Sequence, residues 1–287
     1  MSIQVRNLTH IYNQGMPDED RALSNINFDI YDGEVASIIG HTGSGKSTLV
    51  QHLNGLLKPT EGSIIVGGTD ITKPGVSMLD VRRRVGLVFQ YPEYQLFEET
   101  VAKDVAFGPK NLGLSEKEIE RRVEQALRMV GLDYGDVKDR SPFDLSGGQR
   151  RRVAIAGVIA MKPQVLILDE PTAGLDPGAH RDIMNMIHDV HQAEKNIIIF
   201  VTHNMDDVVR VSDKVLVMDR GKLVTVGTPA EVFSRKLHLE RFGLDVPPVT
   251  AFIRELYRKG SPVDPETLTM QQAADEIVAF LRKKASQ

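Results

Sequence analysis

The chain has 287 residues, of which 41% are hydrophobic and 26% are charged, and it contains no cysteine. The lack of cysteine excludes a disulfide framework, a Cys-ligated zinc site and an iron–sulfur cluster. Lys and Arg number 35 against 39 Asp and Glu, which gives a net charge of −4. No overall charge therefore attracts the protein to nucleic acid or to anionic lipid.

The sequence offers no segment long enough to span a bilayer. Its longest apolar stretch, residues 153–161, has nine residues, whereas a membrane helix needs roughly 20. The N-terminal sequence MSIQVRNLTH lacks the charged leader and apolar run of a signal peptide. By themselves these features predict a cytosolic protein.

Short β-rich runs separated by turns open the chain. We expect strands at residues 3–5, 26–30, 35–39, 63–66 and 85–89, and a helix that ends near Gly55. The run 35–39 is almost continuously apolar, as expected for a strand that is buried on both faces of a sheet.

The middle of the chain is predicted to be helical and then alternates. Helices are expected over residues 92–160, with a capping-box pattern at 115–118 ahead of an apolar stripe. Buried-strand character returns at 165–168 and 197–201, with a helix at about 177–192 between them. This alternation favours an α/β fold with a parallel sheet, into which the helical block 92–161 is inserted.

The character of the chain changes again beyond Gly227. One amphipathic stripe includes Phe252 and Leu256, and a second extends from Met270 to Leu281 behind a capping pattern at 269–272. We therefore expect one α/β domain over residues 1–228 and a small helical appendage over residues 229–287.

A glycine-rich segment follows the strand at 35–39 and precedes a helix. It matches G-x-x-x-x-G-K-[ST] in the strand-to-helix context that this pattern requires. The backbone N–H groups of such a loop point at phosphate oxygens, and the helix N-terminus adds positive potential. Lys46 would reach the β- and γ-phosphates, and the Ser47 hydroxyl would ligate Mg²⁺. The residues predicted to bind ATP here are Gly40, His41, Thr42, Gly43, Ser44, Gly45, Lys46, Ser47 and Thr48.

Two carboxylates follow the apolar run at 165–168. The carboxyl end of a buried parallel strand is where α/β sheets bind their ligands. Asp169 is predicted to hold Mg²⁺, and Glu170 to orient or deprotonate the attacking water. A surface acidic pair would explain the two residues alone, but it becomes the weaker interpretation beside a phosphate loop.

A second potential anion-binding segment precedes a long helical stretch. Its residues are Leu145, Ser146, Gly147, Gly148 and Gln149, and a helix N-terminus with a serine hydroxyl is suited to anions. One nucleotide does not need two such loops from one chain. The combination of motifs resembles the ATP-binding cassette (ABC) ATPases, in which LSGGQ is the signature sequence.

This resemblance covers about residues 3–230 and implies further roles. It implies an ABC ATPase cassette with a RecA-like, mostly parallel sheet, an N-terminal antiparallel β region and an inserted helical subdomain. The signature of one subunit then acts on the ATP of its partner. Gln90 matches the glutamine that contacts Mg²⁺ and water, Asp176 the D-loop, His203 the switch histidine, and Tyr12 the aromatic residue that stacks on adenine.

Four segments narrow the family further. Residues 90–101 and 104–111, the acidic insertion 15–20 and the run 244–250 resemble the ATPases of energy-coupling-factor (ECF) transporters, most closely the second of their two types. The resemblance implies uptake of a vitamin or metal ion. It also implies three partners, namely a second ATPase subunit, a transmembrane scaffold and a substrate-specific membrane subunit. The expected location is the cytoplasmic face of the cell membrane, held there by these partners.

In that family a groove beside the helical insertion receives coupling helices of the scaffold. The residues expected to form it are Glu93, Tyr94, Leu96, Phe97, Glu98 and Glu99. The apolar members would anchor the partner and the acidic ones would face basic residues. Packing within the helical subdomain is an equally good explanation for Leu96 or Phe97 alone.

Three alternatives stay open at this stage. The runs Arg82–Arg84 and Arg150–Arg152 could suggest nucleic acid, but the net charge is negative and no aromatic residues are interleaved, so we expect none. An ordinary ABC importer would share every motif. Soluble ABC ATPases of translation or DNA repair usually carry two cassettes or a long coiled-coil insertion, and this chain has neither.

Overall fold

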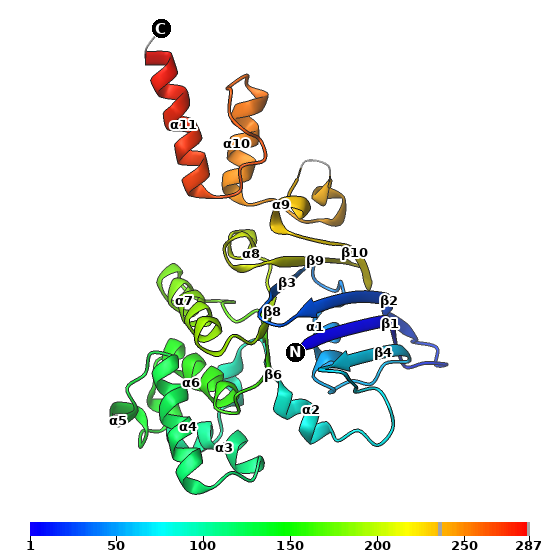
Figure 1. Cartoon of the computed structure of the whole chain (residues 1–287), viewed down its shortest axis with the longest axis vertical. Helices are drawn as coiled ribbons and strands as arrows, with labels where there is room; N and C mark the ends of the chain where they lie inside the picture. Colours follow the sequence, from blue (N-terminus) through cyan, green and yellow to red (C-terminus); the bar gives the residue numbers. More distant parts are fainter. Residues whose placement is uncertain (235–236, 286–287) are drawn as a thin grey trace.

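The computed structural model describes residues 1–234 and 237–285, with side chains as far as residue 282. In this part of the chain ten strands form two sheets (Figure 1). The strands are β1 (Ser2–Tyr12), β2 (Asp20–Tyr31), β3 (Val35–Ile39), β4 (Glu61–Val66), β5 (Thr69–Asp70), β6 (Val85–Val88), β7 (Val165–Asp169), β8 (Ile197–Val201), β9 (Lys214–Asp219) and β10 (Lys222–Gly227).

The described part of the chain contains α-helices and short 3₁₀ turns. The α-helices are α1 (Lys46–Leu53), α2 (Met78–Arg84), α3 (Val101–Asn111), α4 (Glu116–Met129), α5 (Tyr134–Val137), α6 (Gly147–Ile159), α7 (Pro177–Glu194), α8 (Met205–Val211), α9 (Pro229–Val232), α10 (Pro248–Arg258) and α11 (Met270–Ala285). Short 3₁₀ turns are η1 (Pro92–Gln95), η2 (Pro142–Asp144) and η3 (Leu239–Phe242). No helix in the described ranges has both the length and the apolar character needed to cross a membrane.

The larger sheet has the order β10-β9-β3-β8-β7-β6. Its strands are parallel, except that β10 runs antiparallel to β9. The smaller sheet, β2-β1-β4-β5, is antiparallel. The expected α/β cassette, with a mostly parallel core and an N-terminal antiparallel region, is confirmed. β9 and β10 are not among the expected strands, and β1 and β2 extend well beyond the expected 3–5 and 26–30.

The two faces of the larger sheet carry different layers, as the alternation of side chains along β7 shows. Leu166 and Leu168 belong to the core shared with α6 and α7, whereas Val165 and Ile167 pack with α1 and the antiparallel sheet. All residues of β3, β7 and β8 are buried. The sheet is thus covered on both sides, as a parallel sheet requires.

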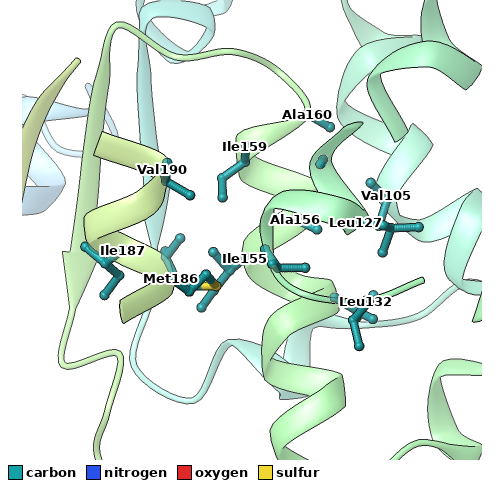
Figure 2. Close-up of a cluster of buried hydrophobic side chains, with 14 of the residues drawn as sticks. Val105, Leu127, Leu132, Ile155, Ala156, Ile159, Ala160, Met186, Ile187 and Val190 are labelled. Atoms are coloured by element: carbon teal, nitrogen blue, oxygen red, sulfur yellow. The ribbon is translucent and has the colours of Figure 1, made fainter. Parts of the chain in front are cut away.

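Helix α6 is apolar on two faces because it lies between two layers. Figure 2 shows Ile155 and Ile159 facing α7, which contributes Met186, while Ala156 lies toward Leu127 of α4. A helix that is buried on more than one side needs apolar residues around most of its circumference. The helix that starts at LSGGQ is therefore the centre of the helical subdomain.

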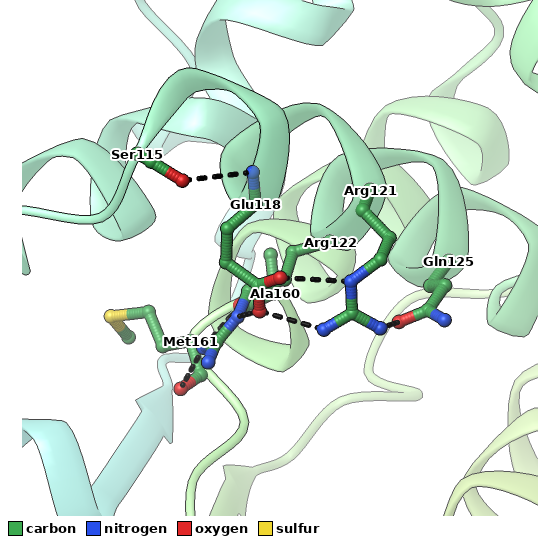
Figure 3. A network of polar contacts seen from close by, with 7 residues as sticks. All are labelled: Ser115, Glu118, Arg121, Arg122, Gln125, Ala160 and Met161. Atoms are coloured by element: carbon green, nitrogen blue, oxygen red, sulfur yellow. Dashed lines mark hydrogen bonds and ion pairs between the residues drawn. The ribbon is translucent and has the colours of Figure 1, made fainter.

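Polar contacts fasten α4 to the end of α6 (Figure 3). Ser115 accepts the Glu118 N–H, but the Glu118 carboxylate pairs with Arg121 and Arg122, so the expected capping box is closed on one side only. Hydrogen bonds from these two arginines lower the pKa of Glu118 to about 2. Arg122 also donates to the Ala160 and Met161 carbonyls, which are acceptors left at a helix end.

The C-terminal helices form a separate small cluster. Val249 and Ile253 of α10 pack against Val263 and Ala273, and Figure 1 shows α10 and α11 extending away from the sheets. The capping pattern at 269–272 is present, because Thr269 and Gln272 each accept the other's backbone N–H. The division of the chain after residue 228 stays a prediction.

Arg151 of α6 joins the helical subdomain to the rest of the cassette. Its side chain is 3% exposed and makes a two-pronged ion pair with Glu93 of η1, at 2.9 and 2.7 Å. The same guanidinium donates to the carbonyls of Pro171 and Ala173 beyond β7, at 3.1 and 2.8 Å. Burial would raise the pKa of Glu93, but the hydrogen bonds from Arg151 outweigh it and hold that pKa below its usual value.

We expect Arg151→Ala to lower the free energy of unfolding by about 3 kcal/mol, because it leaves Glu93 and two carbonyls without their buried partner. The matched control is the neighbouring Arg150→Ala, expected to stay within about 0.5 kcal/mol of wild type. Urea unfolding at neutral pH measures both. Equal midpoints for the two variants would contradict this role for Arg151.

Candidate functional site

The glycine-rich segment forms part of the wall of a cavity at the edge of the larger sheet. It connects β3 to α1, and the cavity beside it has a volume of about 600 Å³. The residues lining the cavity are Tyr12, Asp20, Arg21, Ala22, Thr42, Gly43, Gly45, Lys46, Ser47, Thr48, Gln90, Asp169, Glu170, Arg220 and Gly221. Most of the predicted ATP-binding and metal-binding residues therefore surround one space.

Lys46 lies at the base of this loop and is 8% exposed. Its Nζ donates to the Gly40 carbonyl at 2.7 Å and to the His41 carbonyl at 2.9 Å. Burial lowers the pKa of the Lys46 ammonium, while the nearby carboxylates of Glu170 and Asp169 oppose that shift. A buried ammonium held by two carbonyls near two carboxylates is suited to stabilise phosphate charge.

The carboxylates at the end of β7 have different surroundings. Asp169 is 6% exposed and hydrogen-bonded to the Ser47 hydroxyl; burial raises its pKa, and the charge of Glu170 adds to that effect. Glu170 receives a hydrogen bond from Gln90 Nε2 at 3.0 Å, and His203 Nδ1 lies 3.5 Å from its other oxygen. The structure thus brings Gln90, Glu170 and His203 together at one point.

Glu170 has an unusual backbone conformation, with a φ of 48°. Its N–H donates to the Val201 carbonyl of β8 at 3.0 Å, and its carbonyl accepts from Ala173 N–H. Left-handed conformations of non-glycine residues are strained and persist where surrounding contacts fix them. Here those contacts turn the Glu170 side chain toward Gln90 and His203.

Tyr12 also lines the cavity. Its hydroxyl is 3.3 Å from Thr48 Oγ1, and its ring is 37% exposed. His10 meets the ring edge-on at 4.5 Å and is itself in edge contact with His52. The Tyr12 ring therefore contacts His10 and is still partly exposed to the solvent, and a partly exposed aromatic ring can stack on a base.

The signature segment faces a different depression. Ser146 caps α6 in a complete capping box with Gln149, and Leu145 is buried. Ser146, Gly148 and Gln149 line a cavity of about 290 Å³ beside α7. Within the described chain the signature does not line the cavity that contains Lys46.

Asp176 is the N-cap residue of helix α7. Its carboxylate caps α7 by accepting the N–H groups of Gly178 and Ala179 at 2.8 and 3.1 Å. The N–H of Ala179 and that of Gly178 lower the pKa of Asp176. The D-loop therefore leads directly into a well-capped helix.

A groove lies near the predicted docking surface, and two of the predicted residues, Leu96 and Phe97, line it. Leu96 is 6% exposed and also packs in the core of the helical subdomain, whereas Glu93 is paired with Arg151 and is not among the lining residues. The role of this surface in docking stays a prediction. Tyr94 and Phe97 are exposed, and Glu99 pairs with Lys103 at 2.6 Å.

The groove itself is broader than the sequence indicated. It has a volume of about 470 Å³, and Phe97 and Phe107 meet edge-on at its wall, at 5.0 Å. Its other exposed lining residues include Leu56, Leu79, Arg82 and Arg83. The arginine run was visible in the sequence, but only the position of α2 shows that it borders an apolar groove.

Five residues of the nucleotide cavity were also missed, namely Asp20, Arg21, Ala22, Arg220 and Gly221. Gly221 N–H donates to the Ser44 carbonyl at 3.0 Å, so the turn between β9 and β10 supports the phosphate loop. The sequence Asp219-Arg220-Gly221 is a turn signal of the kind that joins hairpin strands. This turn signal could have been used to predict the β9–β10 hairpin.

Comparisons with known proteins agree with this arrangement. The ABC transporter family profile matches residues 23–173. The chain is 56% identical to the energy-coupling factor transporter ATP-binding protein EcfA2 of Caldanaerobacter subterraneus subsp. tengcongensis, over 98% of both chains. It is also 56% identical to the EcfA2 protein of Clostridium perfringens, over 98% of this chain and 99% of that one.

Solved structures show the same fold. The cbiO1 protein from Clostridium perfringens, described as part of the ABC transporter complex cbiONQ, superposes with a TM-score of 0.73 at 42% identity, covering 83% of this chain and 93% of that one. A dimeric ATP-binding cassette in a post-hydrolysis state, bound to ADP and Pi, superposes with a TM-score of 0.70 at 28% identity, covering 79% and 98%.

We expect Gly221→Ala to destabilise the protein by about 2 kcal/mol, because its φ is +73° and a Cβ would lie 2.5 Å from the Ala22 carbonyl oxygen. The control is Gly243→Ala, which has a φ of +65° and no neighbour within 4 Å of its Cβ. Thermal unfolding of both variants separates backbone strain from the collision. An equal decrease in unfolding temperature for the two variants would mean that the collision with Ala22 of β2 does not contribute.

Proposed function

The chain belongs to the ABC transporter family, and we propose that it is the ATP-hydrolysing subunit of an ECF importer, of the second ATPase type. Near full-length similarity to EcfA2 proteins supports this over an ordinary ABC importer or a soluble ABC ATPase of translation or DNA repair. The subunit energises uptake of a vitamin or metal ion, and a separate membrane subunit selects that substrate.

The observation that carries the proposal is the position of Glu170. Its carboxylate lies between Gln90 and His203, and it borders the same cavity as Lys46. In this proposal Glu170 orients and deprotonates the attacking water, Gln90 positions that water, and His203 contacts the γ-phosphate. Hydrolysis then depends mainly on positioning and charge, because phosphoryl transfer asks little covalent chemistry of the protein.

The remaining site residues bind the nucleotide in this proposal. Lys46 and the backbone N–H groups of the phosphate loop hold the phosphates, and Tyr12 stacks on adenine with Thr48 beside it. The Ser47 hydroxyl and the buried Asp169 carboxylate, hydrogen-bonded to each other, are oxygen donors of the kind that Mg²⁺ prefers, and Gln90 adds a third. Magnesium held there would neutralise phosphate charge during the reaction.

A second cassette completes the site in this proposal. The signature residues line a separate depression from the one that contains Lys46, so the signature acts on the ATP of a partner. We infer a heterodimer with another ECF-type ATPase, in which Asp176 and its neighbours cross the interface. No role in nucleic-acid binding is proposed.

The groove between α2, η1 and α3 would receive the membrane scaffold. Its apolar lining contains Phe97 and Phe107, with Arg82 and Arg83 on one side and Asp104 on another. A coupling helix with an apolar face and both signs of charge at its edges fits this surface. We infer that this contact, together with the substrate-specific subunit, holds the chain at the cytoplasmic face of the cell membrane.

We expect Glu170→Gln to bind ATP with an affinity close to wild type and to lose hydrolysis by at least about 100-fold, because the amide cannot accept the water's proton. Closed dimers should then accumulate with ATP and be visible by size-exclusion chromatography. Glu194→Gln, at the far end of α7, serves as the control and should hydrolyse ATP normally. Near-normal turnover by Glu170→Gln would refute the assignment of Glu170.

We expect Phe97→Asp to weaken copurification with the membrane subunits about tenfold, because it places a charge in an apolar anchor position. Phe97 is 58% exposed, so the substitution should leave the fold intact. Tyr31→Asp is the matched control, since Tyr31 is 52% exposed and lies outside the groove lining. Undiminished recovery of the complex with Phe97→Asp would argue against scaffold binding in this groove.

A further inference from the structure

His41 occupies a variable position of the phosphate loop, yet it makes two directed contacts. Its Nδ1 lies 2.6 Å from the Thr42 carbonyl oxygen, and its Nε2 lies 2.8 Å from Asp219 Oδ1 at the end of β9. The ring is partly exposed, with 36% of its side-chain surface accessible. The phosphate-loop pattern requires no particular residue here, so these contacts need an explanation of their own.

The chemistry of the two acceptors fixes the charge of the ring. A carbonyl oxygen and a carboxylate both accept hydrogen bonds, whereas a neutral imidazole has only one N–H. Both contacts are satisfied at once only when His41 is an imidazolium. With two N–H groups the ring would donate to both acceptors, and its contact with Asp219 would then be an ion pair.

The pair joins the phosphate loop to the turn between β9 and β10. Gly221 N–H donates to the Ser44 carbonyl at 3.0 Å, which makes a second link between the same two segments. The His41 carbonyl in turn accepts from Lys46 Nζ at 2.9 Å. Loss of the contact between the His41 side chain and Asp219 would therefore loosen the phosphate loop. It would also loosen Lys46, which donates to the His41 carbonyl.

Other charged groups surround the pair. Arg220 follows Asp219 and lines the nucleotide cavity. Lys222 lies opposite Asp219 in the backbone register of β9 and β10, and Lys46 of α1 donates to the His41 carbonyl. An imidazolium at His41 adds one more positive charge beside a loop that is built for phosphates.

We propose that His41 is a positioning residue for the nucleoside triphosphate, acting as an imidazolium that pins the phosphate loop to Asp219 and makes ATP affinity depend on its protonation. The inference rests on the proposed ATP binding. As the pH rises, the ring loses one N–H, and a bare Nε2 then faces the Asp219 carboxylate. Affinity for ATP therefore falls as His41 deprotonates.

The test measures the ATP dissociation constant of the full chain by titration calorimetry at about pH 6 and about pH 8.5, because histidine side chains change charge within this range. Each variant is compared with wild type at the same pH, so that the titration of ATP itself cancels. We expect His41→Asn to bind about fivefold more weakly than wild type at the lower pH, which is the range of a charge-assisted hydrogen bond. At the higher pH the two should be nearly equal.

Two further variants separate charge from shape. His41→Lys keeps the cation at both pH values, so its affinity relative to wild type should improve as the pH rises. Asp219→Asn removes the need for an imidazolium, because a neutral ring can donate to the Thr42 carbonyl and accept from the Asn amide. This variant should therefore flatten the pH dependence of the ATP dissociation constant. His188→Asn, an exposed histidine of α7, is the control and should keep the wild-type dependence.

A ratio between His41→Asn and wild type that is the same at both pH values would overturn the proposal. If His41→Asn does not fold, as judged by circular dichroism, the pH dependence of Asp219→Asn decides in its place. ATP binding by wild type with no effect of any variant would refute this inference alone. A wild-type chain that binds no ATP at either pH would overturn the proposed function as well.

Discussion

Parallel pairing of three buried strands is the constraint on which the site depends. The register aligns Ile38 of β3 with Val201 of β8, and Val201 with Asp169 of β7. Three chain segments therefore leave the sheet at the same edge, and each continues into part of the site. The phosphate loop follows β3, Glu170 follows β7, and His203 lies two residues beyond β8. A shift of one residue in this register would exchange the side chains that face the two layers and would move the strand ends that lead into the site, so the core and the site are specified together.

The charges at this edge are balanced rather than simply positive. Lys46 is buried among Gly40 and His41 carbonyls, and two carboxylates lie close enough to oppose the lowering of its pKa. Asp169 is the more deeply buried of the two, and burial raises its pKa although the Ser47 hydroxyl acts in the opposite direction. Phosphate groups and a divalent cation entering this site would meet partners for both signs of charge.

Short local motifs explain why the pieces of the site could be predicted from the sequence. The phosphate loop, the Asp169-Glu170 pair and the signature each occupy a few consecutive residues, and each adjoins a buried strand or a helix start. Residues that depend on distant pairing were harder to find. Arg220 and Gly221 reach the cavity through the β9–β10 hairpin, which was not expected, and Glu93 is taken inward by Arg151, 58 residues away. No pattern around Glu93 reveals that partner, because α6 meets η1 only in the folded chain.

The segment from Gln90 to Phe97 connects the two proposed working surfaces. At one end Gln90 contacts Glu170, and at the other Phe97 lines the groove. Between them Glu93 is held by Arg151, which begins in the signature helix and also binds the carbonyls of Pro171 and Ala173, just beyond Glu170. A movement of α6 against the sheet must therefore strain or carry η1 with it, since the buried ion pair costs too much to break in isolation. The Arg151 guanidinium therefore contacts both the segment that follows Glu170 and the segment that leads to the groove.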